Sequence, residues 1–144
     1  MKLHDARVLA MQILYTTDLN AISKEKALES YENLDQKAID FVNLVNDNLD
    51  KIDFVISVCL KNYTINRLNL VDKAIIRLAT AEFIEGKNDK RIIINEALEL
   101  TKEFSDQGDH KAVSFNNKLL DNISVRVKDL IWNGRALFNS NGIN

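Results

Sequence analysis

The sequence predicts an all-α protein, and three observations support that prediction. Proline is absent and glycine occurs only four times in 144 residues, and both residue types interrupt helices. Apolar residues recur every three or four positions, which is the spacing of helices with one buried face. The apolar share is 46% and the charged share 28%, which is typical of a globular chain rather than a disordered one. We therefore expect a compact bundle of about six or seven helices.

The helices can be assigned in order from the apolar spacing and from capping residues. The first half predicts a helix over 4–19, a short helix capped by Ser23 and ending near Asn33, and a segment capped by Asp35 that runs to about Leu60 with a break near Asp50. The second half predicts a connector at 67–70, a strongly amphipathic helix from Val71 that stops at Gly86, a helix over 94–104 with Asn95 and Glu96 at its start, and a last helix from about Phe115 to Ile131.

The length of the chain is that of one domain. We expect residues 1–138 to form that domain and residues 139–144 to be a frayed tail. No run approaches the roughly 18–20 apolar residues of a membrane span, and the N-terminus lacks the order of a signal peptide. We therefore expect a cytoplasmic protein that does not bind membranes.

The sequence contains few residues that could support catalysis or bind a metal ion. Cys59 is the only cysteine, and it lies in an apolar stretch, so we interpret it as a buried and inert thiol. The two histidines, His4 and His110, are far apart in sequence. No closely spaced glycines form a phosphate-binding loop. We expect no enzymatic activity, no metal and no cofactor.

The charge is unevenly distributed, although the formal net charge is only −2. Residues 111–144 carry five basic and two acidic side chains. A basic end on an acidic body permits an anionic partner at one place, but on this feature alone we favour an ordinary solvated helix face.

Four motifs together resemble those of the NusB family of bacterial transcription antitermination factors, over essentially the whole chain. They are Ala10-Met11-Gln12-Ile13-Leu14-Tyr15; Arg67-Leu68 followed by Val71-Asp72-x-x-Ile75-Ile76-Arg77-Leu78-Ala79-x-x-Glu82; Ile94-Asn95-Glu96-Ala97-Leu98-Glu99-Leu100; and Phe115-x-Asn117-x-Leu119-Leu120-Asp121. The resemblance implies an all-α fold of two packed helical subdomains. It also implies binding of boxA RNA together with the ribosomal protein NusE, within an antitermination complex on RNA polymerase.

The resemblance and the charge pattern together suggest the binding residues. The RNA-binding candidates are Lys2, His4, Arg7, His110, Lys111, Phe115, Asn117 and Lys118, and Asp72 matches a position of the NusE interface, where we expect an exposed carboxylate. The family's first helix normally opens with an Arg-rich run, of which only Arg7 is retained here. Lys118 stands where the family motif has a glycine, and it adds one positive charge in place of those missing from the first helix.

Two alternatives stay open at individual residues. Phe115 is either a core residue or a platform on which an unpaired base stacks. Arg77 and Glu82 are interpreted as a structural ion pair rather than as RNA contacts.

Two alternatives also stay open for the whole chain. One is a protein-interaction adaptor whose RNA surface has decayed. The other is a stand-alone relative of the NusB-like domain of ribosomal RNA cytosine methyltransferases.

Overall fold

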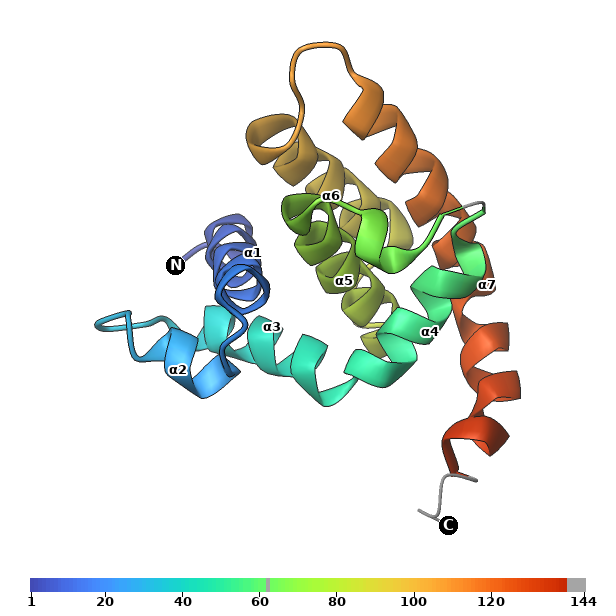
Figure 1. Ribbon diagram of the computed structural model, residues 1–144, viewed down its shortest axis with the longest axis horizontal. Helices are drawn as coiled ribbons and strands as arrows, with labels where there is room; N and C mark the ends of the chain where they lie inside the picture. Colours follow the sequence, from blue (N-terminus) through green and yellow to red (C-terminus); the bar gives the residue numbers. More distant parts are fainter. Residues whose placement is uncertain (62, 140–144) are drawn as a thin grey trace.

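The computed structural model describes residues 1–61 and 63–139, with the side chains of residues 133–139 left out of the description. The described residues form seven α-helices and one short 3-10 turn, and they include no strand. The helices are α1 (Leu3–Asn20), α2 (Lys24–Leu28), α3 (Gln36–Asp47), α4 (Leu49–Cys59), α5 (Leu70–Glu85), α6 (Lys90–Phe104) and α7 (Lys111–Asn139), with the 3-10 turn η1 at Ile65–Arg67 (Figure 1). The predicted all-α class is confirmed.

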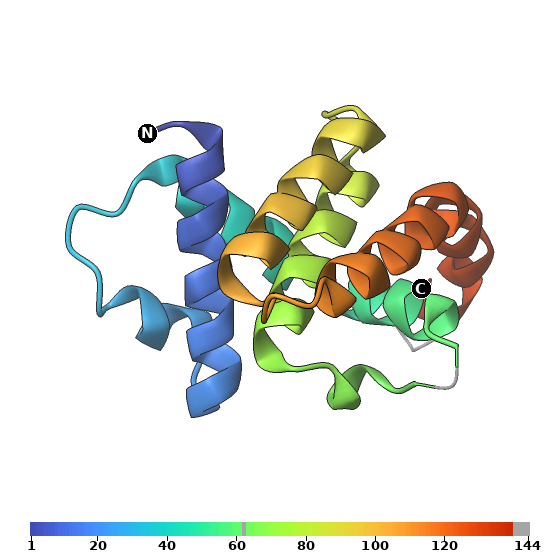
Figure 2. The same ribbon diagram turned by 90° about the horizontal axis from the view of Figure 1, so that it is seen from above.

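The helices form two groups that share α5. On one side, α1 packs against α2, α3 and α5, and α3 also contacts α5. On the other side, α4, α6 and α7 all contact α5, and α7 also packs against α4 and α6. Seen from above, α5 and α6 lie between α1 and α7 (Figure 2). The predicted arrangement of two packed subdomains is confirmed, and it separates the N-terminal helix from the C-terminal one.

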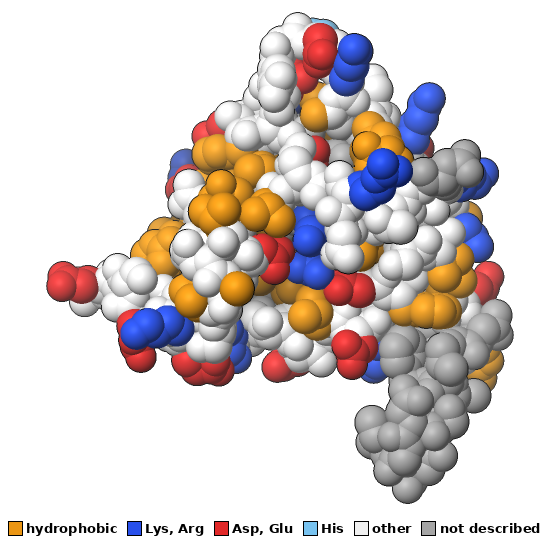
Figure 3. Space-filling view, viewed as in Figure 1, with side chains coloured by type: hydrophobic (Ala, Val, Ile, Leu, Met, Phe, Trp, Pro, Cys, Tyr) orange, Lys and Arg blue, Asp and Glu red, His pale blue; other side chains and the backbone are white. Residues whose placement is uncertain are grey.

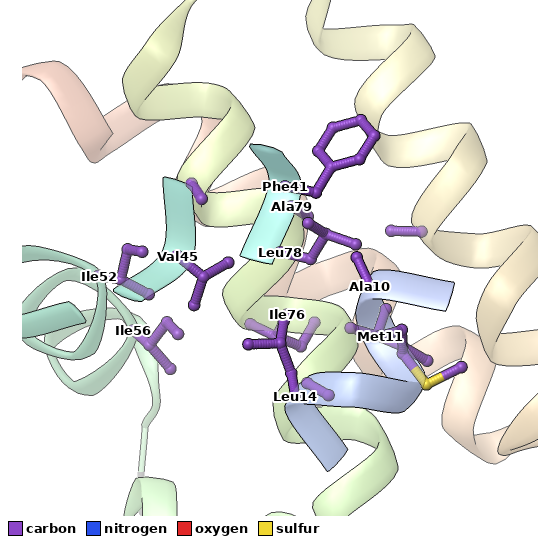
Figure 4. Close-up of a cluster of buried hydrophobic side chains, with 14 of the residues drawn as sticks. Ala10, Met11, Leu14, Phe41, Val45, Ile52, Ile56, Ile76, Leu78 and Ala79 are labelled. Atoms are coloured by element: carbon purple, nitrogen blue, oxygen red, sulfur yellow. The ribbon is translucent and has the colours of Figure 1, made fainter. Parts of the chain in front are cut away.

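The hydrophobic core is continuous through both groups. Its centre contains side chains from α1, α3, α4 and α5, among them Met11, Val45, Ile56, Ile76 and Leu78, each at most 1% exposed (Figure 4). Burial of each large apolar side chain stabilises the fold by roughly 1.5–3 kcal/mol before chain entropy is subtracted. The apolar spacing correctly predicted the inward face of α5, since Ala74, Ile75, Leu78 and Ala79 are all buried.

Local capping explains where most helices begin and end. Ser23 Oγ accepts a hydrogen bond from the Lys26 backbone N–H at 3.1 Å, and the Asp35 carboxylate accepts one from Lys37 N–H at 2.8 Å. Helix α5 ends at Gly86, which has φ of +75° and so occupies the left-handed region that glycine adopts without strain. These three boundary residues were expected from the sequence.

Two sequence expectations about helix boundaries are wrong, namely the end of α2 and the start of α6. Helix α2 ends at Leu28 rather than near Asn33, which itself has a positive φ of 53° and cannot continue a helix. The break expected near Asp50 is present and falls at Asn48, whose side chain donates to the Leu44 carbonyl at 2.8 Å. Such side-chain bonds to the backbone compete with the helical pattern.

The start of α6 also differs from the expectation. Asp89 caps this helix by accepting a hydrogen bond from Arg91 N–H at 2.8 Å, so α6 begins at Lys90. Asn95 and Glu96 therefore lie inside the helix rather than at its start. The buried face is correspondingly built by Ile93, Ala97, Leu100 and Thr101, while Phe104 is exposed.

In the part of the chain that the structure describes, no helix has the length and apolar character needed to cross a membrane. Helix α7 continues to Asn139. The remainder of the tail expected at 139–144 lies outside the described residues.

Candidate nucleic-acid and protein interfaces

An exposed aromatic pair lies where the first turns of α7 face the segment after α4. The rings of Phe115 and Tyr63 are 5.7 Å apart, centroid to centroid, and tilted by 54°. Phe115 is 38% exposed and Tyr63 is 45% exposed. Phe115 is therefore not a core residue, and of the two alternatives left open the structure retains the surface one.

Basic side chains surround this aromatic pair. The guanidinium of Arg67 lies 5.9 Å from the centre of the Tyr63 ring. Lys61 and Lys118 line the same hollow as Phe115, and both are exposed. Figure 3 shows Lys and Arg side chains spaced along the edge over α7 and the segment after α4. We call Lys61, Tyr63, Arg67, Phe115 and Lys118 the α7 surface.

The other candidates near the start of α7 are polar and exposed. Lys111 begins the helix, and its backbone N–H donates to Asp109 at 3.1 Å. His110 has a positive φ of 60°, and its ring lies 3.8 Å from the Asp106 carboxylate. Asn117 is exposed, whereas its neighbour Asn116 is fully buried.

Arg7 is not available as a surface cation. It is 3% exposed, and its Nε and Nη2 donate to the two carboxylate oxygens of Glu82 at 3.0 and 2.8 Å. The guanidinium also lies 5.2 Å from the centre of the Phe41 ring. Burial alone would lower the Arg7 pKa, but the hydrogen bonds and charge of Glu82 raise it, and the pKa of Arg7 is raised overall, so the guanidinium stays charged. The position fits a structural role better than contact with phosphate.

The expected pairing of Arg77 with Glu82 is wrong. Arg77 donates to both oxygens of Asp53 at 2.9 Å and to Asp18 at 3.0 Å, which joins α5 to α4 and α1. Arg77 and Glu82 are each part of a structural ion pair, but with other partners.

His4 and Lys2 lie at the start of α1. His4 Nδ1 is 2.9 Å from Glu96 and its Nε2 is 3.8 Å from Glu103, both on α6. The hydrogen bond with Glu96 raises the pKa of His4 above its ordinary value. Lys2 is exposed. Because α5 and α6 lie between α1 and α7, the structure does not bring these residues to the α7 surface.

Asp72 is buried instead of exposed. It is 8% exposed and accepts hydrogen bonds from the side chains of Asn69 at 2.7 Å, Ser105 at 2.7 Å and Asn116 at 3.0 Å. Asn116 also donates to Thr101 at 3.1 Å, and its Oδ1 has no partner among the described residues. The expectation of an exposed Asp72 carboxylate is wrong because three donors from three segments enclose it.

A second hollow lies directly beside Asp72. It is lined by residues from α1, from the start of α5 and from the end of α6, namely Tyr15, Asn69, Leu70, Val71, Phe104, Ser105 and Gln107. Phe104 is 36% exposed there. We call this set the α5–α6 hollow. It combines apolar and polar side chains, as protein interfaces do.

Cys59 lines the hollow of the α7 surface but is only 4% exposed. Burial raises the pKa of its thiol, and the nearby Arg126 lowers it in part. The thiol is therefore protonated at neutral pH, as the sequence suggested. Among the described residues, no group of three His, Cys, Asp or Glu side chains has the geometry of a metal site.

The seven-helix arrangement defines the class: an all-α protein of two helical subdomains that share one central helix. Within that class, the NusB family model matches residues 4–125. The chain is 39% identical to the transcription antitermination protein NusB of Clostridium botulinum (strain Alaska E43 / Type E3) over 129 residues, covering 82% of this chain and 94% of the relative. It is 37% identical to the protein of the same name from Bacillus subtilis (strain 168), covering 89% and 98%.

Solved structures agree with this assignment. The NusB structure from T. maritima superimposes with a TM-score of 0.74 at 26% identity, covering 87% of this chain and 92% of that one. A chain from a crystal structure of the antitermination factors NusB and NusE in complex with double-stranded RNA gives a TM-score of 0.70 at 26% identity, covering 87% and 98%. The chain therefore belongs to the NusB family, as its motifs suggested.

Proposed function

We propose that this protein is a transcription antitermination factor that binds boxA-type RNA together with the ribosomal protein NusE during ribosomal RNA transcription. The curated relatives are named for antitermination, and a related structure contains NusB, NusE and RNA. In this role the protein acts within a complex on RNA polymerase. It works by binding rather than by catalysis, in the cytoplasm, with residues 1–138 as one RNA-binding domain.

The α7 surface is the observation that supports RNA binding most directly. Proteins that hold single-stranded RNA combine exposed aromatic rings, on which bases stack, with cations that contact phosphates. Phe115 and Tyr63 supply the rings, and Lys61, Arg67 and Lys118 supply the charge. His110, Lys111 and Asn117 extend this surface along the start of α7.

The RNA-binding candidates at the start of α1 contribute differently from those along α7. We propose that the RNA strand follows α7. Arg7 does not contact this strand, because its guanidinium is already paired with the Glu82 carboxylate. Lys2 and His4 lie on the far side of α5 and α6, so they serve only an RNA long enough to cross that distance.

We propose the α5–α6 hollow as the surface for NusE. Its apolar side chains, among them Phe104 and Tyr15, are accessible to a partner at the point where Asp72 fixes the local structure. Asp72 acts from beneath, by holding Asn69 and Ser105 in the wall of the hollow.

A protein-interaction adaptor is the second candidate function. The scarcity of free positive charge at the N-terminus of α1 favours it. Arg7 is buried and His4 is paired with two glutamates, so this end of the molecule offers RNA little free positive charge.

RNA binding measured at several salt concentrations separates the two functions. Fluorescence anisotropy with labelled boxA RNA should show weak binding by the protein alone and much tighter binding when NusE is present, because a second RNA-contacting surface makes part of the association intramolecular. The three cations of the α7 surface, together with Lys111, make four phosphate contacts, which predict a log–log salt slope of about −3 for single-stranded RNA. Binding of NusE with no effect of RNA at any salt concentration would favour the adaptor.

A further inference from the structure

We propose that the hollow beside Phe115 binds one unstacked nucleobase and that Asn122 is the residue that reads the edge of this base. The proposal rests on the RNA-binding function proposed above, and it specifies which part of the RNA this site recognises.

The hollow has the dimensions of a small-ligand site. Its volume is about 360 Å³, and its lining residues are Cys59, Leu60, Lys61, Phe115, Lys118, Leu119 and Asn122. Small-molecule pockets begin at roughly 300 Å³. One wall is therefore a single stripe of α7, since positions 115, 118, 119 and 122 follow helical spacing, and the other wall is the end of α4.

The walls offer a nucleobase the contacts that it needs. Phe115 exposes 38% of its surface, and its ring can stack against the face of a base. Leu60 and Leu119 are buried at 8% and 6% exposure and provide an apolar floor. Lys61 and Lys118 are exposed at the rim, where the phosphates on either side of an inserted base would lie.

Asn122 lies at the other end of this stripe. It is seven residues after Phe115, so the two Cα atoms are roughly 10 Å apart along the helix axis. Helical side chains lean toward the N-terminus, which directs the Asn122 amide back toward Phe115. A base stacked on Phe115 would then present its edge to that amide.

The hydrogen bonding of Asn122 predicts which base is preferred. Its Nδ2 donates to the Cys59 backbone carbonyl at 3.5 Å. Its Oδ1 takes no part in that bond, and because Asn122 lines the hollow this oxygen is an acceptor that a base could reach. An acceptor pairs with the exocyclic amino group of adenine (N6) or cytosine (N4), whereas uracil carries the carbonyl oxygen O4 at the equivalent position. We therefore expect adenine or cytosine to be preferred over uracil.

The test uses the whole protein, NusE and labelled boxA RNAs in which each position in turn is replaced by an abasic site. The most sensitive position is then varied through the four bases. Three variants are compared with the wild type: Asn122→Ala, Phe115→Ala, and Val125→Ala as a matched control on the exposed side of α7, where Val125 is 75% exposed.

We expect one abasic position to weaken wild-type binding roughly tenfold, as the loss of one stacked base does. At that position uracil should bind roughly three- to tenfold more weakly than adenine or cytosine, the value of about one hydrogen bond. Asn122→Ala should abolish this preference while the abasic effect remains, Phe115→Ala should remove both, and Val125→Ala should change neither.

A base preference that survives Asn122→Ala would overturn the proposal, and so would uracil binding as tightly as adenine and cytosine. Both results leave RNA binding at the α7 surface intact. RNA affinity that is unchanged in Phe115→Ala would instead contradict the proposed function itself.

Discussion

Asp72 on α5 and Asn116 on α7 are joined by a hydrogen bond of 3.0 Å inside the protein. Through this bond, the residue that supports the α5–α6 hollow also anchors the helix that carries Phe115. Ser105 adds a third segment, because its hydroxyl donates to the same Asp72 oxygen at 2.7 Å. The two proposed interfaces thus share one buried polar cluster.

Replacing Asp72 by lysine should destabilise the fold by about 3–5 kcal/mol, since it removes the acceptor of three donors and buries an unpaired positive charge. Urea denaturation measures this change directly. Asp47→Lys is the matched control, because Asp47 is exposed at the end of α3. Wild-type stability in Asp72→Lys would show that the buried cluster is not structurally important.

Arg7→Ala should destabilise the protein by about 3–5 kcal/mol, because it leaves the Glu82 carboxylate buried without its partner. The double variant Arg7→Met/Glu82→Leu should recover most of that loss, since both charges are then absent. Chemical denaturation of the two variants gives the comparison. If the double variant is as unstable as Arg7→Ala, an unpaired Glu82 carboxylate is not the cause of the loss.

The contact between His4 and Glu96 should make stability depend on pH. Since the folded-state pKa of His4 is raised, its contribution is fully present below the unfolded value of about 6.5 and is lost as pH rises through the folded value. The melting temperature of wild type relative to His4→Gln should therefore fall as the pH rises above about 6.5. A difference that grows with pH would have the opposite sign and would exclude the contact.

Leu78→Ala should cost about 2–5 kcal/mol, the range for truncation of a buried leucine, because Leu78 is 1% exposed at the centre of the core. Ile92→Ala is the control, as Ile92 is 51% exposed on α6. Both values come from the same denaturation assay. A cost below about 1 kcal/mol for Leu78→Ala would be that of a surface position.

The core and the surface were not equally predictable from the sequence. Leu78 and Gly86 were assigned correctly because local spacing and backbone preference decide their roles. Arg7 was not, because its residue type favours the surface and its partner Glu82 lies 75 positions away. Asn116 and Asn117 differ by one helical step, yet one is buried and one exposed. Only the packing of α7 against α5 and α6 separates them.

Two phenylalanines test the central claim most directly, because they are almost equally exposed but lie on different proposed interfaces. Phe115 is 38% exposed at the α7 surface, and Phe104 is 36% exposed at the α5–α6 hollow. The measurement is boxA RNA binding by anisotropy for Phe115→Ala and Phe104→Ala, each with and without NusE, with thermal melts to establish that both variants are folded.

We expect the two variants to lose different parts of the RNA binding. Phe115→Ala should lose about 1–3 kcal/mol of RNA binding in both conditions, the value of one stacked base. Phe104→Ala should bind RNA normally by itself and lose only the increase in affinity that NusE provides. If Phe115→Ala binds RNA as tightly as the wild type while Phe104→Ala does not, the RNA surface has been assigned to the wrong face of the molecule.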